Sequence, residues 1–338
     1  MQRLNDIKSS TFNALHAIAR GSDAGLVYAD DAKFWCSHPF NENVGLDHIR
    51  AFWRAMHHAF PDMERRDSIF VAGDSIADPR TPQFPAGRQL VAAMGHFQAT
   101  FEHDFCGIPA TRGVVHLRFG EVHHIVAGKI VHTWALIDLL DLMRQAGVWP
   151  IAPSLGAEGM WPGPASGNGV ATDRCDAQRG EAAMRIVLSM HAALGAFDGK
   201  RVASMPYEPY WTKNFMWYGP SGIGATRGIK GFRAHHQVPF LLGFPDRKGV
   251  GHFVRIGDGD YAVTGGWPSV SGTHLGEWLG LPGTGRKIDL RIMDFYRVDG
   301  DRIAENWVPI DVIDMLRQMG FDIFERLARL RGAPRLDL

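Results

Sequence analysis

Asp301-Arg-Ile-Ala-Glu-Asn-Trp-Val-Pro-Ile-Asp311-Val-Ile-Asp-Met-Leu-Arg-Gln-Met-Gly320 decides the fold, because the chain carries this stretch twice. Its earlier copy reads Gly128-Lys-Ile-Val-His-Thr-Trp-Ala-Leu-Ile-Asp138-Leu-Leu-Asp-Leu-Met-Arg-Gln-Ala-Gly147. The Trp, the two Asp, the Gln and the final Gly recur at a constant spacing of 173 residues. This spacing exceeds the repeat of a solenoid, which is about 20–50 residues, and indicates two whole domains.

Three further blocks recur upstream in the same order. Gly107-Ile-Pro-Ala-Thr111 returns as Gly280-Leu-Pro-Gly-Thr284, and Phe60-Pro-Asp62 returns as Phe244-Pro-Asp246. The segment 45–51 likewise matches the segment 228–234. We therefore expect two copies of one domain, with a linker rich in Pro and Gly between them. The expected boundaries are 1–150 for the first domain, 151–177 for the linker and 178–330 for the second domain.

The composition of the 338 residues is that of an ordinary globular protein, with 45% hydrophobic and 21% charged residues. Lys plus Arg and Asp plus Glu both number 36, so the formal net charge is zero. This balance argues against nucleic acid and anionic membranes as partners. Cys36, Cys106 and Cys175 form no CxxC pair, and no run of eighteen apolar residues occurs. We expect a reduced, cytoplasmic protein without a membrane span.

Hydrophobic spacing predicts the same series of elements in each half: helices first, then a meander of antiparallel strands, then a short helix. The first half is expected to have helices at 8–20 and 45–58, strands at 69–71, 90–100, 114–126 and 130–136, and a closing helix at 138–145. The second half is expected to have helices at 181–194 and 229–241, an extended segment at 210–218, strands at 252–256, 261–271, 287–298 and 302–309, and a closing helix at 312–319. An insert, Asp78–Gly87, occurs only in the first half. The fold class is α+β, with helices covering one face of each sheet.

In their order and double occurrence these blocks resemble the SnoaL-like polyketide cyclases and predicted ester cyclases of the nuclear-transport-factor-2-like superfamily. The matching elements are Phe-Pro-Asp, the Gly-x-Pro-x-Thr turn, the strand Trp and the closing Asp…Gln-x-Gly, and they cover most of both halves. The resemblance implies two tandem cystatin-like cones, each with a curved antiparallel sheet and a pocket under its helices. Because single-domain relatives often pair through their sheets, it also implies an internal pseudo-dimer and leaves a homodimer of the whole chain open.

The chain departs from this family at the catalytic base. The resemblance places that base, an Asp, on the last strand, three residues before the Asp that opens the closing helix. Ala135 and Val308 occupy these positions here. Whether the chain is an enzyme, of the lyase or isomerase class, therefore stays open.

Two functions fit this pattern. The first is cofactor-free and metal-free carbon-acid chemistry on a hydrophobic carbonyl compound, of an enolate, aldol, isomerase or dehydratase type, as the resemblance implies. The second is non-catalytic binding of small hydrophobic or aromatic molecules in two degenerate pockets. The missing Asp favours binding, whereas a recurring acid on another strand favours catalysis.

That recurring acid is Glu121 in the first half and Asp294 in the second, at the same spacing of 173 residues. A period of two places each in a row of apolar side chains, where an unpaired carboxylate is unfavourable. Burial would raise the pKa of such an acid toward that of a general base, and we expect both residues to be catalytic. An Arg partner, a solvated strand end or a bulge at Gly120 would make them structural instead.

Six other residues are candidate polar groups of the pockets. Thr133 and Asn306 share a strand face with Ala135 and Val308, and Tyr296 follows Asp294 on its own face. The remaining candidates are His38, His96 and Tyr218. No HExxH, GxSxG or complete phosphate-binding loop occurs, so the sequence predicts neither a metal or cofactor site nor a nucleophile.

The repeated acids Asp138 and Asp311 stand where the closing helices start, and we interpret them as N-caps. Asp138→Ala and Asp311→Ala should each lower the free energy of unfolding by about 1 kcal/mol and leave ligand binding nearly unchanged. Denaturant unfolding with a binding assay checks this. A variant that keeps its stability but loses binding would contradict the capping role.

Overall fold

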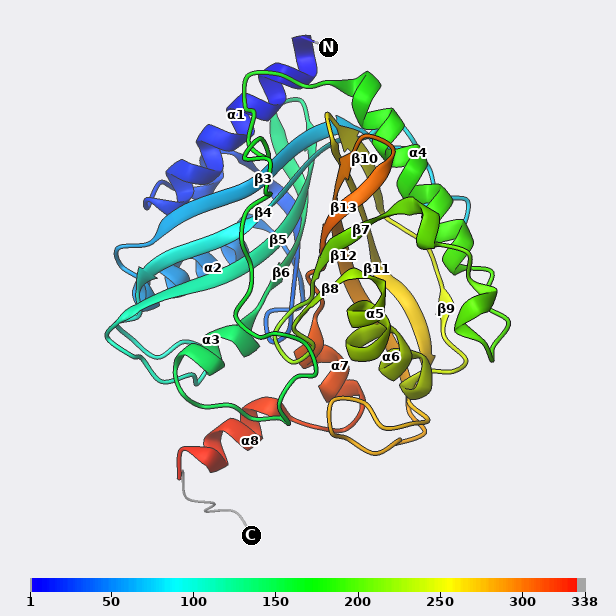
Figure 1. The fold of residues 1–338 in the computed structure, drawn as a ribbon. Coiled ribbons are helices and arrows are strands. Elements are labelled where there is room, and N and C mark those ends of the chain that lie inside the picture. Colours follow the sequence, from blue (N-terminus) through cyan, green and yellow to red (C-terminus); the bar gives the residue numbers. More distant parts are fainter. Residues whose placement is uncertain (1, 333–338) are drawn as a thin grey trace.

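The computed structural model describes residues 2–332 and contains two sheets that face each other, with helices on their outer sides (Figure 1). The predicted α+β class is confirmed. The sheets are mixed rather than wholly antiparallel, because β1 (Tyr28–Cys36) runs parallel to β6 (Lys129–Ile137) and β7 (Trp211–Tyr218) runs parallel to β13 (Arg302–Trp307). In each half the strand after the first helix thus pairs with the last strand. The alternation of side chains along a strand does not show which other strand it pairs with.

The first half, which ends at α3, builds a sheet of six strands in the order β2-β1-β6-β5-β4-β3. The other strands are β2 (Glu42–Val44), β3 (Glu64–Asp74), β4 (Gln89–Thr100) and β5 (Val114–Val126). Its helices are α1 (Gln2–Ala19), α2 (Leu46–Ala59) and α3 (Leu139–Gln145), and a short 3-10 turn spans Ala24–Leu26. The helix α1 starts before the predicted residue 8, because Leu4 and Ile7 extend its apolar face into the core.

The second half, which starts at α4, builds a sheet in the order β10-β11-β12-β13-β7-β8, with β9 paired to β11. Its other strands are β8 (Ala225–Arg227), β9 (Lys248–Gly249), β10 (Val254–Asp258), β11 (Tyr261–Thr273) and β12 (Lys287–Asp299). Its helices are α4 (Ala177–Leu194), α5 (Gly228–Phe232), α6 (Val238–Gly243), α7 (Val312–Gln318) and α8 (Ile323–Leu330). Short 3-10 turns at Val202–Ser204 and Glu208–Tyr210 precede β7.

The helix predicted at 229–241 is interrupted by a π-helical turn, Arg233–Gln237, between α5 and α6. At its end the Val238 N–H donates to the carbonyl of Arg233, five residues earlier. Pro239 follows at the start of α6 and has no N–H to donate. The wider turn thus lies beside a residue that cannot continue the regular α-helical bonds.

The inner faces of the two sheets pack against each other in one apolar cluster that contains no helical residue from the described chain. Trp134 of the first sheet stacks on Phe253, with ring centroids 4.3 Å apart, and Trp307 of the second stacks on Tyr218 at 5.1 Å. Both Trp side chains are fully buried. The repeated Trp residues are therefore packing groups of the contact between the sheets, and the outer faces remain for the helices.

The capping role of the repeated acids is confirmed. The Asp138 side chain accepts the Asp141 N–H at 3.0 Å, and Asp311 accepts the Asp314 N–H at 3.1 Å. Asp141 and Asp314 in turn bind Arg side chains one turn further along their helices. The signature Asp-x-x-Asp thus closes the first turn of α3 and of α7.

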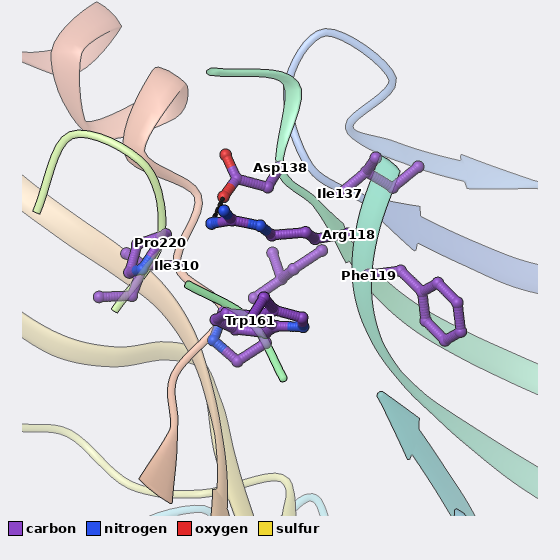
Figure 2. A pocket seen from close by; sticks show the side chains of 9 residues that line it. Arg118, Phe119, Ile137, Asp138, Trp161, Pro220 and Ile310 are labelled. Carbon is purple, nitrogen blue, oxygen red and sulfur yellow. Dashed lines mark hydrogen bonds and ion pairs between the residues drawn. The ribbon is translucent and has the colours of Figure 1, made fainter. Parts of the chain in front are cut away.

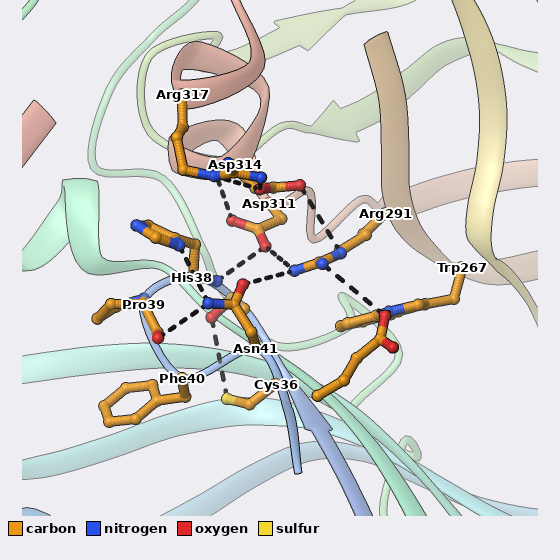
Figure 3. Close-up of polar contacts among 12 residues, drawn as sticks. Cys36, His38, Pro39, Phe40, Asn41, Trp267, Arg291, Asp311, Asp314 and Arg317 are labelled. Atoms are coloured by element: carbon orange, nitrogen blue, oxygen red, sulfur yellow. Dashed lines mark hydrogen bonds and ion pairs between the residues drawn. The ribbon is translucent and has the colours of Figure 1, made fainter. Parts of the chain in front are cut away.

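Each cap also contacts the opposite half. Asp138 accepts the Ser221 N–H at 2.9 Å, and Asp311 accepts the His38 N–H at 2.9 Å (Figure 3). The Arg291 guanidinium donates to Asp311 and to Asn41, both at 3.2 Å. The same carboxylates that start the closing helices therefore hold the two halves together by nearly symmetric bonds.

Gly120 lies where β5 approaches the other half. A Cβ atom there would lie 2.5 Å from Pro309 Cγ and 3.3 Å from Phe295 Cε2. Gly120→Ala should therefore lower the free energy of unfolding by about 1–3 kcal/mol, as overpacking does. Urea unfolding measures this loss, with Gly113→Ala as the control, because the nearest atom there is Thr111 Oγ1 at 3.8 Å. Equal stability of the two variants would contradict this close approach of the halves.

Candidate active site

Glu121 and Asp294 lie on the helix-covered faces of their sheets, beside the interior of each half. The strand β5 pairs with β4 without a register shift from Val114 to His124, so Gly120 is not a bulge. Glu121 is 6% exposed and lies opposite Ala135 of β6. The carboxylate therefore lies beside the position where the family base is missing.

In the first half this carboxylate has a cationic partner. Glu121 Oε1 lies 2.5 Å from Arg65 Nη2 and 3.1 Å from His123 Nε2. Burial alone would raise the pKa of Glu121, but Arg65 and His123 outweigh burial and lower the pKa to about 2. The expectation of a raised pKa for Glu121 is therefore wrong, because the alternative of an Arg partner is the one that occurs.

The other polar groups of this interior are also paired. Arg65 binds Asp67 at 2.7 Å, and Asp67 contacts His16 Nε2 at 2.8 Å. Thr133 Oγ1 lies 2.8 Å from His123 Nδ1 and 3.3 Å from the Tyr28 hydroxyl. The predicted residues Glu121 and Thr133 are thus brought into one network, in which His123 contacts both of them.

In the second half the equivalent acid, Asp294, has different surroundings. Among the described residues no Arg, Lys or His forms an ion pair with Asp294, and Gly249 occupies the place that Arg65 has in the first half. Gly249 pairs with Val270 of β11 as Arg65 pairs with Phe97 of β4. The substitution of Arg by Gly removes the cation while the acid remains.

Burial therefore controls the protonation of Asp294. The residue keeps some surface exposure, and burial nevertheless raises the pKa of its carboxyl group to about 7. Hydrogen bonds from Asn306, at 3.4 Å, and from the Tyr296 hydroxyl favour the charged form without offsetting burial. Three predicted residues, Asp294, Tyr296 and Asn306, thus come together in one cluster.

His191 of α4 completes this cluster and was not predicted. Its Nε2 lies 2.9 Å from the Tyr296 hydroxyl, and burial lowers the pKa of His191 to about 4. A signal for it exists, because His16 and His191 occupy the same place, three residues before the last residue of α1 and of α4. Burial also raises the pKa of Tyr296 well above its ordinary value, so both groups are neutral hydrogen-bonding partners near pH 7.

Three predicted pocket residues lie elsewhere. His38 stands in the contact between the halves, where its ring contacts Asn41 (Figure 3). His96 alternates with the interior residues of β4, so its ring lies beside His116 on the sheet's other side. Tyr218 stacks on Trp307 between the sheets. These three do not join either acid.

A second repeated feature was missed by the sequence analysis. Arg118 and Arg291 occupy equivalent positions on β5 and β12, and each binds the acids that open a closing helix. Arg118 lines a narrow hollow between the halves together with Asp138, Trp161, Pro220 and neighbouring residues (Figure 2). The hollow belongs to the contact between the halves, because its walls come from both of them and from the connecting segment.

The family model described as SnoaL-like polyketide cyclase matches residues 83–146 and 200–319, which together exceed half of the chain. The chain belongs to the SnoaL-like polyketide cyclase family. No match was found among curated proteins. In the part of the chain from 2 to 332, no helix has the length and apolar character that a membrane crossing needs, and no three His, Cys, Asp or Glu side chains are grouped to hold a metal ion.

Three solved structures of similar proteins each cover less than half of this chain. AclR from Streptomyces galilaeus, a proposed hydroxylase, is 21% identical, covers 44% of this chain and 89% of its own, and gives a TM-score of 0.33. IdmH from Streptomyces antibioticus, a proposed polyketide cyclase, is 19% identical over 42% of this chain and 99% of its own, with a TM-score of 0.31. A proposed polyketide cyclase from Xanthomonas campestris pv. campestris is 16% identical over 42% and 98%, with a TM-score of 0.33.

The pKa of Asp294 predicts how stability changes with pH. Between its ordinary value of 3.8 and about 7, the folded chain holds a proton that the unfolded chain has lost, so stability falls as pH rises through this window. Asp294→Asn should therefore be more stable than the parent at pH 8, by up to about 4 kcal/mol, the limit for a pKa difference of about three. The gain should vanish near pH 4.

Urea unfolding at both pH values measures this difference. Asp299→Asn, at the exposed end of the same strand, is the control and should change little. A constant difference between Asp294→Asn and the parent from pH 4 to pH 8 would show that Asp294 is not a buried acid with a raised pKa.

Proposed function

We propose that the second half catalyses cofactor-independent carbon-acid chemistry of the cyclase type on a small hydrophobic or aromatic carbonyl compound. The observation that carries this proposal is Asp294, an interior carboxylate that has no cationic partner within residues 2–332 and has a pKa of about 7. A general base is most effective when its pKa lies near the working pH. The partial exposure of Asp294 supports access by a substrate.

In the proposed step Asp294 removes a proton from the carbon next to the carbonyl group. The electrons of the C–H bond form the carbon–carbon double bond of an enolate, and the carbonyl oxygen takes the negative charge. The Tyr296 hydroxyl and the Asn306 amide, which already contact the carboxylate, are the donors that we assign to this oxygen. The proton returns from Asp294 to carbon or to a leaving hydroxyl, which regenerates the base.

We assign a different role to the first half. The pKa of about 2 makes Glu121 a weak base, and its ion pair with Arg65 would have to break before it could accept a proton. The paired interior supports a structural role or non-catalytic binding of an apolar molecule. We further propose that the sheet-to-sheet contact makes the chain an internal pseudo-dimer, which the apolar cluster shared by both sheets supports.

Hydrogen–deuterium exchange at the α-carbon of aromatic and alicyclic ketones in D2O, followed by NMR, tests the proposal without knowledge of the product. Asp294→Asn keeps the shape of the side chain but cannot accept the proton, and should slow exchange by about 10²–10⁴-fold with little change in KM. In the parent, kcat/KM should rise with pH and level off above about 7.

Glu121→Gln is the matched variant in the first half. It should slow exchange far less than Asp294→Asn, because the paired acid takes no part in the proton transfer. Exchange that survives Asp294→Asn and is lost in Glu121→Gln would contradict the assignment of the base. Binding of these ketones with no catalysed exchange in the parent would favour non-catalytic binding of small molecules as the function instead.

A further inference from the structure

The insert of the first half lies against the second half. It belongs to the connection between β3 and β4, whereas the equivalent strands β10 and β11 are joined by a tight turn at Gly259 and Asp260. The Ile76 N–H donates to the Arg255 carbonyl at 2.9 Å, and Arg255 Nη1 donates to the Ala77 carbonyl at 3.2 Å. The segment at Ile76 and Ala77 thus lies alongside β10, at the edge of the second sheet.

A buried carboxylate anchors this contact. Asp78 is 2% exposed and forms ion pairs with Arg80, at 2.7 Å, and with Arg255. Its Oδ2 also accepts the N–H of His252 at 3.0 Å, and the Thr81 hydroxyl donates to the carbonyl of His252 at 2.7 Å. The insert therefore holds His252 by both its backbone N–H and its carbonyl.

The residue before His252 shows how closely the insert packs. Gly251 has a φ of +126°, and a Cβ atom there would lie 2.5 Å from Thr81 Cγ2 and 3.0 Å from Arg80 Cβ. Only glycine combines this backbone conformation with so little space. The insert thus fixes the position of His252 by two backbone hydrogen bonds and by close packing at Gly251.

His252 leads to the acid of the second half. Its ring lies 5.4 Å from the ring of His191, and His191 Nε2 lies 2.9 Å from the Tyr296 hydroxyl, which contacts Asp294. Burial lowers the pKa of His252 to about 3 and that of His191 to about 4, so both rings are neutral near pH 7. The nearby charges are those of Asp78, Arg80 and Arg255 on the insert and on β10.

We propose that the insert of the first half is a positioning element of the site in the second half. Asp78 and Thr81 fix His252, His252 packs against His191, and His191 orients the Tyr296 hydroxyl next to Asp294. Asp78 is thus a positioning residue, since it acts through these side chains and does not touch the reacting atoms. This inference rests on the proposed role of Asp294 and adds that one half completes the site of the other.

The test uses the full chain with Asp78→Ala and, as a milder change, Thr81→Val. The readouts are the titration of the Asp294 carboxyl by carbon-13 NMR, identified by its loss in Asp294→Asn, and the α-carbon exchange rate. Release of His252 should admit water and move the pKa of Asp294 toward the ordinary value of about 4. Exchange should slow by up to about 10²-fold through kcat, as misplacement by about 1 Å can do, and Asp78→Glu should restore part of it.

Asp62→Ala is the control, because Asp62 accepts the N–H and the hydroxyl of Thr100 in the first half, away from the insert. Folded Asp78→Ala and Thr81→Val variants with unchanged Asp294 titration and exchange would overturn the inference. So would an equal change in Asp62→Ala. A parent chain in which Asp294 already titrates near 4 would contradict the proposed function itself, and the inference with it.

Discussion

A carboxylate that is removed from water must either find a cation or keep its proton, and the two halves of this chain meet that constraint in opposite ways. Glu121 is held by Arg65 and stays charged at neutral pH. Asp294, at the equivalent place, has Gly249 where Arg65 would stand, and burial raises its pKa to about 7. The presence of Arg65 in one half and of Gly249 in the other, each two strands away from the acid, thus accompanies a paired acid and an acid with a raised pKa.

The packing of the sheets allows the halves to diverge in this way. Because Trp134 and Trp307 bury the inner faces against each other, each interior lies on the far side of its own sheet. The caps Asp138 and Asp311 add bonds across the contact. The interior of the first half holds the network around Glu121 and Arg65. The insert of the first half contacts the second half at His252.

Much of this fold follows from the sequence, because the repeat aligns the elements of one half with those of the other. The order of most helices and strands and the two caps came from local patterns. The parallel pairing of β1 with β6 did not, since side-chain alternation does not name a strand's neighbour. The helix α8 lies beyond the repeated stretch and had no counterpart to reveal it.

The site was predicted in part. Alternation placed Tyr296 on the face of Asp294 and Asn306 on the face of Val308, but it could not show that Arg65 would reach Glu121 from β3. His191 comes from a helix more than a hundred residues away from Asp294 in the sequence, and it was not predicted, although it matches His16 of the first half. Ion pairs and hydrogen bonds between segments that are far apart in the chain therefore could not be predicted from the sequence.

The most direct test of the central claim is a carbon-13 NMR titration of the side-chain carboxyls of the unmodified chain, with Glu121 and Asp294 assigned by substitution. The account predicts that Asp294 titrates near pH 7 and that Glu121 stays ionised down to about pH 2. Titration of both carboxyls near pH 4, as for exposed acids, would contradict it.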